Sequence, residues 1–259
     1  MRLGWVVLAA TGCRSILGID TPGDTPDAPI GVPGDGKHAD AAIHDDSSIP
    51  VLPDAPPGAP ALVQSAQTES SGASSVAVKL SSPVVAGDLV VVAVGVFDGS
   101  PTEMLADTLN NGWGQAVAPT SSGGISTTTW FTIVQNGGAS DTITVNFGKS
   151  ESFPDVRVVE YTNIASAGTI DATTGNSGTS ASPSATLTTH AANDLLVASD
   201  YSSTFVTAVG NGFDEILLSS PSQNVLATRV GATAAQYTAS ATLETPVGWV
   251  MQLVAFRAK

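Results

Sequence analysis

Few side chains in this sequence are equipped for hydrolytic chemistry. General acid–base and nucleophilic catalysis usually need a His, a Cys or paired carboxylates. From residue 61 onward the chain holds no cysteine and a single histidine, His190, in a turn-like THAAND stretch. A Ser-His-Asp triad would have to be built on His190, but the chain has no G-x-S-x-G motif, and the H-E-x-x-H pattern of zinc hydrolases is missing too. We therefore predict that His190 is a surface turn residue and that the protein is not an enzyme.

Paired carboxylates are the remaining route to hydrolysis, as in glycoside hydrolases. The candidates are Glu160, Asp171 and Asp155. Glu160 lies between valines in VRVVEY and can point inward, where Arg157 or Arg229 would pair with it. We expect a structural ion pair or hydrogen bond there. A glycan-acting hydrolase is the less favoured alternative, and it requires Glu160 to share an open cleft with a second acid.

One predicted turn offers side chains suited to ligand binding. Trp113 follows an Asn-Asn-Gly turn signal, and an exposed Trp at the edge of a sandwich can stack on a sugar ring. Oxygens of Asp107, Asn110 and Asn111 could approach Ca²⁺, but the pattern falls short of an EF-hand. Capping of the turn by these side chains is favoured instead. The candidate ligand-binding residues are therefore Trp113, Asp107 and Asn111, with no metal and no cofactor.

Core packing is the competing explanation for Trp113, because a second copy of the same turn carries Phe213 in its place. A binding function predicts an exposed aromatic side chain at Trp113, Tyr201 or Phe205. Burial of all three would favour a purely structural protein.

The elements that must position these side chains are β-strands. Short β-branched runs alternate with turn residues from Ala61 onward, the spacing of sandwiches and barrels, and no convincing helical period occurs. Residues 76–80 and 142–147 alternate between apolar and polar, as expected of strands with one buried and one solvent-exposed face. Residues 89–97 (LVVVAVGVF) are apolar on both faces, which predicts a central strand covered on both sides.

Two halves of the chain resemble each other. The segment LSSPVVAGDLVVVAV (80–94) is echoed by LTTHAANDLLVAS (187–199), and further pairs follow in the same order. They are 111–113 with 211–213, 128–134 with 225–230, 142–147 with 237–243 and 156–161 with 249–256. This pattern indicates an internal duplication of about 80–90 residues.

The predicted fold is all-β: a jelly-roll-like β-sandwich with internal duplication at residues 61–259, with halves at about 75–164 and 184–256. The alternative is two tandem Ig-like sandwiches, for which the Gly/Ser/Thr-rich stretch 165–184 would serve as the linker. The two apolar faces of residues 89–97 and the scarcity of large side chains in each half favour one sandwich.

The N-terminus has the features of an export signal. Arg2 precedes the apolar run LGWVVLAA at 3–10, which is too short to span a membrane but fits a signal peptide at residues 1–12. Ala-Thr-Gly then leads to Cys13, the only cysteine. This arrangement resembles the lipobox of bacterial lipoproteins. The resemblance implies lipidation of Cys13 and a stable lipid anchor in the membrane, and Arg14 in place of an Asp favours the outer membrane.

A linker is predicted between this anchor and the β region, at residues 13–60. Positions 19–60 hold nine of the sixteen prolines and eight aspartates. Such a segment cannot build a core, so we expect it to be disordered and to act as a spacer.

The chain from about residue 75 is also similar to an uncharacterised β-sandwich module of bacterial surface proteins. The motifs that carry this resemblance are AGDLVVVAV (86–94), DTLNNGW (107–113), TTTWFTIV (127–134), DTITVNF (141–147) and VVEYTNI (158–164). The resemblance implies an extracellular module and no defined activity.

Composition narrows the choice of partners. The chain has 23 acidic and 9 basic residues, a net charge of −14, and no basic patch, so a nucleic-acid partner is not expected. Only 12% of residues are charged, against roughly 25% in ordinary soluble domains. We predict an exported, lipid-anchored envelope protein that displays a non-catalytic binding or adhesion module for a glycan or a surface protein. A purely structural envelope protein is the alternative.

Overall fold

The computed structural model describes residues 58–97, 99 and 104–259. The predicted signal peptide, Cys13 and the linker up to residue 57 lie outside the described residues. Within that part of the chain the regular secondary structure is β-strand throughout. No helix there is long and apolar enough to cross a membrane.

Sixteen strands form two sets of eight. The first set is β1 (Ala61–Glu69), β2 (Ala73–Leu80), β3 (Leu89–Val96), β4 (Met104–Asp107), β5 (Gly114–Ser122), β6 (Ile125–Ile133), β7 (Asp141–Glu151) and β8 (Asp155–Thr162). The second set is β9 (Ile170–Ser180), β10 (Ser184–Thr188), β11 (Asp194–Ser202), β12 (Val206–Gly210), β13 (Asp214–Leu218), β14 (Val225–Gly231), β15 (Gln236–Leu243) and β16 (Val247–Phe256).

The strand pairing of the first half is that of a jelly roll. β1 pairs with β8, β2 with β7 and β3 with β6, all antiparallel, as when a long hairpin is rolled into two facing sheets. β5 departs from this scheme because it pairs with β6 rather than β4. The result is a five-stranded sheet, β1-β8-β3-β6-β5, opposite a three-stranded sheet, β2-β7-β4.

The second half repeats this arrangement strand for strand. Its sheets are β13-β14-β11-β16-β9 and β10-β15-β12, which is the first order with eight added to each strand number. The all-β fold with internal duplication is thus confirmed. It takes the form of two sandwich units, so the preference for one sandwich over two was wrong. The stretch 165–184, considered as a linker for the tandem arrangement, is not one. It contains β9, which pairs along its length with β16.

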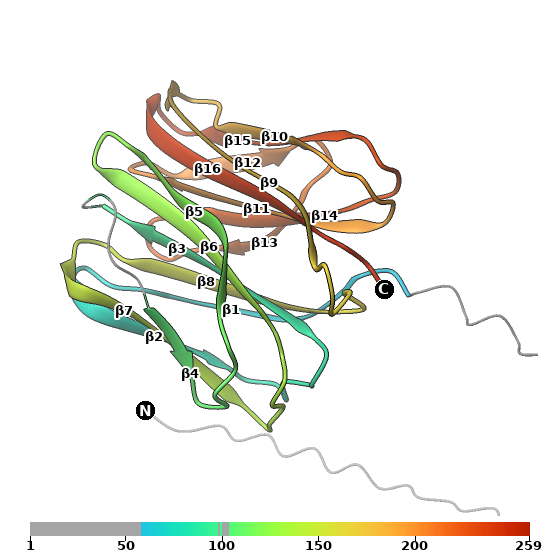
Figure 1. Cartoon of the computed structure of the whole chain (residues 1–259). Helices are drawn as coiled ribbons and strands as arrows, with labels where there is room; N and C mark the ends of the chain where they lie inside the picture. Colours follow the sequence, from blue (N-terminus) through green and yellow to red (C-terminus); the bar gives the residue numbers. More distant parts are fainter. Residues whose placement is uncertain (1–57, 98, 100–103) are drawn as a thin grey trace, which may run out of the picture. The chain divides into compact units, whose positions relative to one another are not determined.

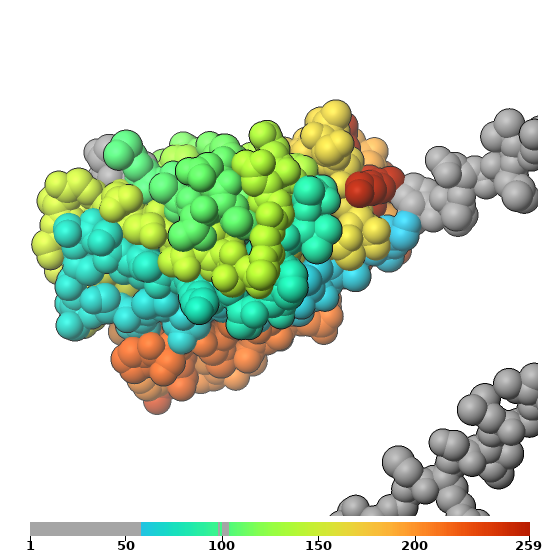
Figure 2. Space-filling view, turned by 90° about the horizontal axis from the view of Figure 1, so that it is seen from below, coloured from blue at the N-terminus to red at the C-terminus, as the bar shows by residue number. Residues whose placement is uncertain are grey.

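The four sheets are stacked as layers, with the five-stranded sheets inside and the three-stranded sheets outside (Figure 1). One apolar core fills each sandwich, and a third fills the space between the two five-stranded sheets. In Figure 2 the cyan to yellow-green residues of the first half cover most of the face that is seen.

The third core explains why β3 is apolar on both faces. Val90, Val92 and Val94 point into the core of their own sandwich, whereas Val91 and Ala93 point into the core shared with the second half. β7, in an outer sheet, buries only alternate residues. Burial on both sides therefore belongs to the inner sheets, as in other doubly covered sheets.

The two inner sheets meet through equivalent residues. The hydroxyl of Tyr161 on β8 hydrogen-bonds with Thr228 Oγ1 on β14 over 2.7 Å. Phe256 occupies the matching position on β16. Tyr161 pairs with Leu89, the first residue of β3, and Phe256 pairs with Leu195, the second residue of β11. The ring of Phe256 packs on Phe131 of β6, with centroids 5.8 Å apart. The halves thus face each other around a pseudo-twofold axis, like the subunits of a symmetric dimer.

Two glycines allow this close approach. A Cβ on Gly95 of β3 would overlap the ring of Tyr201 on β11, and a Cβ on Gly175 of β9 would overlap Oγ1 of Thr120 on β5. Each contact joins one half to the other, so the spacing of the inner sheets depends on the absence of a side chain at these two positions.

Candidate ligand-binding cleft

The predicted ligand-binding residues lie together at the end of β4 and in the loop that follows it. Asp107 Oδ1 accepts hydrogen bonds from the backbone N–H groups of Leu109 (2.9 Å) and Asn111 (3.0 Å), and Oδ2 accepts one from Trp113 Nε1 (2.9 Å). Both carboxylate oxygens are thus occupied by donors of the same loop, which is the capping role of an Asx turn.

Asn111 joins this loop to the next. It is buried, and its Oδ1 accepts hydrogen bonds from the N–H groups of Gln135 (2.8 Å) and Asn136 (2.9 Å). Trp113 is half-buried and packs against the core of the first sandwich. The contacts of Asp107, Asn111 and Trp113 describe a rigid turn, and their role in binding stays a prediction.

Glu160 does not lie in an open cleft. Its side chain is buried and accepts hydrogen bonds from Gln64 Nε2 (2.5 Å) and the backbone N–H of Val85 (3.4 Å). Burial raises the pKa of Glu160 above the usual range, although these two hydrogen bonds oppose the shift. The geometry required of a hydrolase based on Glu160 is absent, and its partner is an amide rather than Arg157 or Arg229.

His190 and Asp171 meet at the start of the second half. Asp171 accepts hydrogen bonds from the backbone N–H of His190 (2.5 Å) and from Arg257 Nη2 (2.8 Å), and the side chain of His190 is exposed. Burial, together with the neighbouring Asp171, raises the pKa of Asp194 to about 7. The side chain of Asp171 is inaccessible and Asp194 is buried, so we assign this cluster to holding β9, β11 and the end of β16 together.

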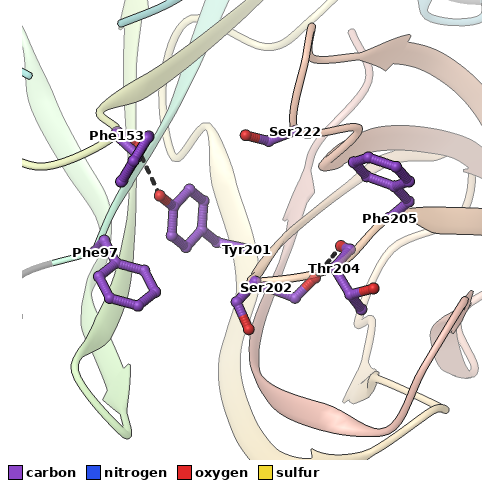
Figure 3. A pocket seen from close by; sticks show the side chains of 8 residues that line it. Phe97, Phe153, Tyr201, Ser202, Thr204, Phe205 and Ser222 are labelled. Carbon is purple, nitrogen blue, oxygen red and sulfur yellow. Dashed lines mark hydrogen bonds between the residues drawn. The ribbon is translucent and has the colours of Figure 1, made fainter. Parts of the chain in front are cut away.

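A cleft of about 240 Å³ opens where loops of both halves meet. Phe97 follows β3 and Phe153 lies between β7 and β8. In the second half, residues 201–202 end β11, residues 203–205 connect it to β12, and Ser222 precedes β14. Figure 3 shows Phe97 and Phe153 on one side, Phe205 on the other and Tyr201 between them. Hydroxyl groups of Ser202, Ser203, Thr204 and Ser222 complete the lining, which holds no charged side chain.

The aromatic residues of this cleft are unusual in their exposure. Phe97, Phe153 and Phe205 are 41%, 50% and 44% exposed. Among the described residues they are the only exposed aromatic side chains, and all three line the same cleft. Scattered exposed apolar residues need no explanation, but their convergence on one concavity does.

The loops that carry these rings are fixed by backbone hydrogen bonds. Phe97 N–H donates to the carbonyl oxygen of Ser152 (3.1 Å), and the carbonyl oxygen of Phe205 accepts from Glu244 N–H (2.9 Å). The backbone N–H of Ser222 donates to Glu69 of the first half (3.1 Å), and its hydroxyl donates to the same carboxylate. The first two bonds each lie within one half, and the contact of Ser222 with Glu69 ties the cleft loops of the second half to the first.

A buried polar network adjoins the cleft. Ser202 N–H donates to Asn224 Oδ1 (3.0 Å), and Asn224 Nδ2 donates to Asp155 Oδ2 (3.1 Å). Arg157 Nε lies 3.4 Å from Asp155 Oδ1, and Asp200 Oδ1 accepts from the N–H of Val225 (2.6 Å).

Burial dominates the electrostatics of this network. It raises the pKa of Asp155, and it raises that of Asp200 to about 6, although Arg157 opposes both shifts. The network carries two acids and one base, so it does not present a positive site to an anionic ligand.

Sequence reasoning singled out Tyr201 and Phe205 but missed Phe97 and Phe153. Tyr201 is buried and Phe205 is exposed. A signal for Phe153 was present, since a large apolar residue sits beside Ser and Pro between two strands (ESFPD).

The fold and the cleft define a class: a duplicated jelly-roll protein with an aromatic-lined, uncharged cleft between its halves. No family model matches the chain, and comparisons with curated proteins and with solved structures likewise return no match.

Proposed function

We propose that the protein is a cell-envelope lipoprotein whose β region is a non-catalytic binding module, and that its ligand is an uncharged glycan bound in the aromatic cleft. One observation carries the choice of site. All exposed aromatic side chains of the described region, Phe97, Phe153 and Phe205, line one cleft. Three exposed phenylalanines keep apolar surface in contact with water, which is unfavourable. A ligand that covers them removes this surface from water, and the free energy gained favours binding.

The chemistry of the lining favours a sugar without charge. Aromatic faces pack against the apolar C–H face of a pyranose ring. The hydroxyl group of Ser203 can donate to and accept from ligand hydroxyls, and that of Ser222, which donates to Glu69, can accept from them. The region from residue 61 holds 15 acidic and 6 basic residues, which disfavours acidic glycans.

The N-terminal sequence supports display at the cell surface. The apolar run at 3–10 and Cys13 fit a lipid anchor, the Pro/Asp-rich linker fits a spacer, and the similarity to bacterial surface modules fits an extracellular position. Lipidation predicts that Cys13→Ala abolishes incorporation of radiolabelled palmitate. Labelling that persists in this variant would exclude the anchor.

The binding proposal is tested with the full-length chain on an array of uncharged and acidic glycans. We expect retention on uncharged glycans that Phe205→Ala reduces at least tenfold, because this change removes one wall of the cleft. Retention only on acidic glycans would contradict the proposed chemistry. No retention on any glycan would contradict the proposed function and favour a purely structural envelope protein.

A further inference from the structure

Phe153 has a backbone conformation that its residue type disfavours. Its φ angle is +50°, in the left-handed region where a Cβ crowds the following carbonyl. Besides glycines, the described residues with positive φ are four asparagines, Gln223 and Phe153. Asparagine tolerates this region, whereas a bulky apolar residue there is a genuine outlier.

The second half of the molecule holds Phe153 in this conformation. The hydroxyl of Tyr201 donates a hydrogen bond to the carbonyl oxygen of Phe153 over 2.7 Å (Figure 3). The ring of Tyr201 occupies the space that a side chain at position 95 would fill. Gly95 therefore lets the tyrosine reach across the boundary between the halves.

The strained backbone displays the ring rather than burying it. The side chain of Phe153 is half exposed, and its ring meets that of Phe97 edge to face, with centroids 6.4 Å apart and an interplanar angle of 82°. Strain and exposure both cost stability. Phe153 has both unfavourable features and lies at the wall of a cleft, which favours a role of its side chain in binding.

We propose that Phe153 is the main ligand-contacting residue of the cleft and that Tyr201 is its positioning residue. This inference rests on the proposed function. The ring of Phe153 covers the apolar face of an uncharged sugar, and the Tyr201 hydroxyl keeps the loop in the conformation that presents the ring. The strain makes a distinctive prediction, because a glycine relieves it whereas an alanine does not.

The first experiment compares Phe153→Gly with Phe153→Ala in the full-length chain. Both variants lose the ring, but only glycine is free of strain at positive φ, so we expect the glycine variant to unfold about 2–4 °C above the alanine variant. Gln223 has a similar φ of +55°. The pair Gln223→Gly and Gln223→Ala therefore measures the glycine–alanine difference at a second position with the same backbone conformation. An alanine variant at position 153 that is as stable as the glycine variant would overturn the strain argument.

The second measurement is binding by the same variants. The probes are cellohexaose, chitohexaose and laminarihexaose, titrated into the full-length chain. We expect Phe153→Gly to weaken binding at least tenfold and Gln223→Gly to change it less than twofold. Binding by the unmodified chain that survives Phe153→Gly would overturn this inference alone. Lack of binding of all three probes by the unmodified chain would count against the proposed function itself.

Tyr201→Phe tests the positioning role. It keeps the ring over Gly95 and removes only the hydroxyl that holds Phe153. We expect binding to weaken about three- to tenfold in the unmodified background, and no further weakening when the change is added to Phe153→Gly. This non-additivity is the signature of acting through Phe153. Equal losses in both backgrounds would show a general structural role and overturn the assignment.

Discussion

At the residue scale, the most informative side chains are polar ones buried between the halves. Arg157 is fully buried beside Asp155, and its Nη1 donates to the carbonyl oxygen of Val225. Gln252 occupies the matching position in the second half, and its side chain bonds Thr129 Oγ1 (2.8 Å) and Thr120 Oγ1 (2.9 Å) of the first half. Each half thus sends one long polar side chain into the other.

Loss of the Arg157 charge should strongly destabilise the fold. Arg157→Ala leaves Asp155 and Asp200 buried with no cation to offset them, and we expect the free energy of unfolding in urea to fall by about 3–5 kcal/mol. Arg229→Ala is a suitable control, since that residue is only half-buried. A loss below 1 kcal/mol for Arg157→Ala would show that the network does not hold the halves together.

The buried acids predict how stability depends on pH. The folded-state pKa of Asp194 is about 7 and that of Asp200 about 6, both above an unfolded value of roughly 3.9. The folded state therefore binds the protons more tightly, and the free energy of unfolding falls as pH rises through these values. We expect a loss of about 1–3 kcal/mol between pH 5 and pH 8.

Asp194→Asn should remove much of this dependence, and the exposed Glu215→Gln should leave it unchanged. Urea unfolding of the three proteins at pH 5, 6.5 and 8 measures the effect. Stability that increases from pH 5 to pH 8 in the unmodified chain would contradict the assignment.

Residue-level prediction from the sequence was uneven, for physical reasons. An inward Glu160 followed from its valine neighbours and is observed, but its partner Gln64 lies 96 positions away and carries no local signal. The exposure of Phe97 and Phe153 depends on how two loops meet across the halves. Apolar residues in such loops look like ordinary core until the partner loop is placed.

At the scale of elements, the apolar and polar pattern of the sequence predicted most strands. A strand that lacks such a pattern is explained by its pairing with a neighbouring strand. The doubly apolar β3 was predicted as a central strand and is one, with a core on each face. β9 (IDATTGNSGTS) was not recognised, because its residues have no apolar face and its ladder with β16 supplies the stability. Strand propensity depends on such a context more than helix propensity does.

Glycines at the contact between elements should resist substitution. Gly95→Ala forces the new methyl group into the ring of Tyr201, and Gly175→Ala forces it against Thr120. We expect each change to cost about 1–3 kcal/mol of unfolding free energy, as overpacked sites do. Gly248→Ala in β16 is the control, because nothing lies within 4 Å of a Cβ there. Similar effects of all three changes in urea titrations would show that the sheets are not closely apposed.

At the scale of the whole molecule, duplication accounts for the architecture. Each half alone would expose one apolar face of a five-stranded sheet, which the other half covers through the shared core. The sequence echoes predicted the repeat. They did not predict two facing sandwiches. The two apolar faces of residues 89–97 favoured one sandwich, but a strand in the inner sheet of two facing sandwiches is covered on both faces as well.

Separated halves should therefore recognise each other. We expect chains cut between β8 and β9, at residues 163–169, to copurify when they are co-expressed. The first half produced alone should self-associate or precipitate, since a large exposed apolar face is an association site. Size-exclusion chromatography measures both outcomes. A first half that is stable and monomeric, and that does not copurify with the second half, would show that the core shared by the two five-stranded sheets does not hold the halves together.

Binding of an uncharged glycan in the aromatic cleft is tested by comparing two variants of the full-length chain. Calorimetric titration with the oligosaccharide best retained on the array is carried out for Phe205→Ala and for Trp113→Ala. We expect Phe205→Ala to weaken binding at least tenfold. Trp113→Ala, in the hydrogen-bonded turn after β4, should change it less than twofold. Loss of binding in Trp113→Ala with full binding in Phe205→Ala would exclude the aromatic cleft as the binding site and place the ligand at Trp113, Asp107 and Asn111.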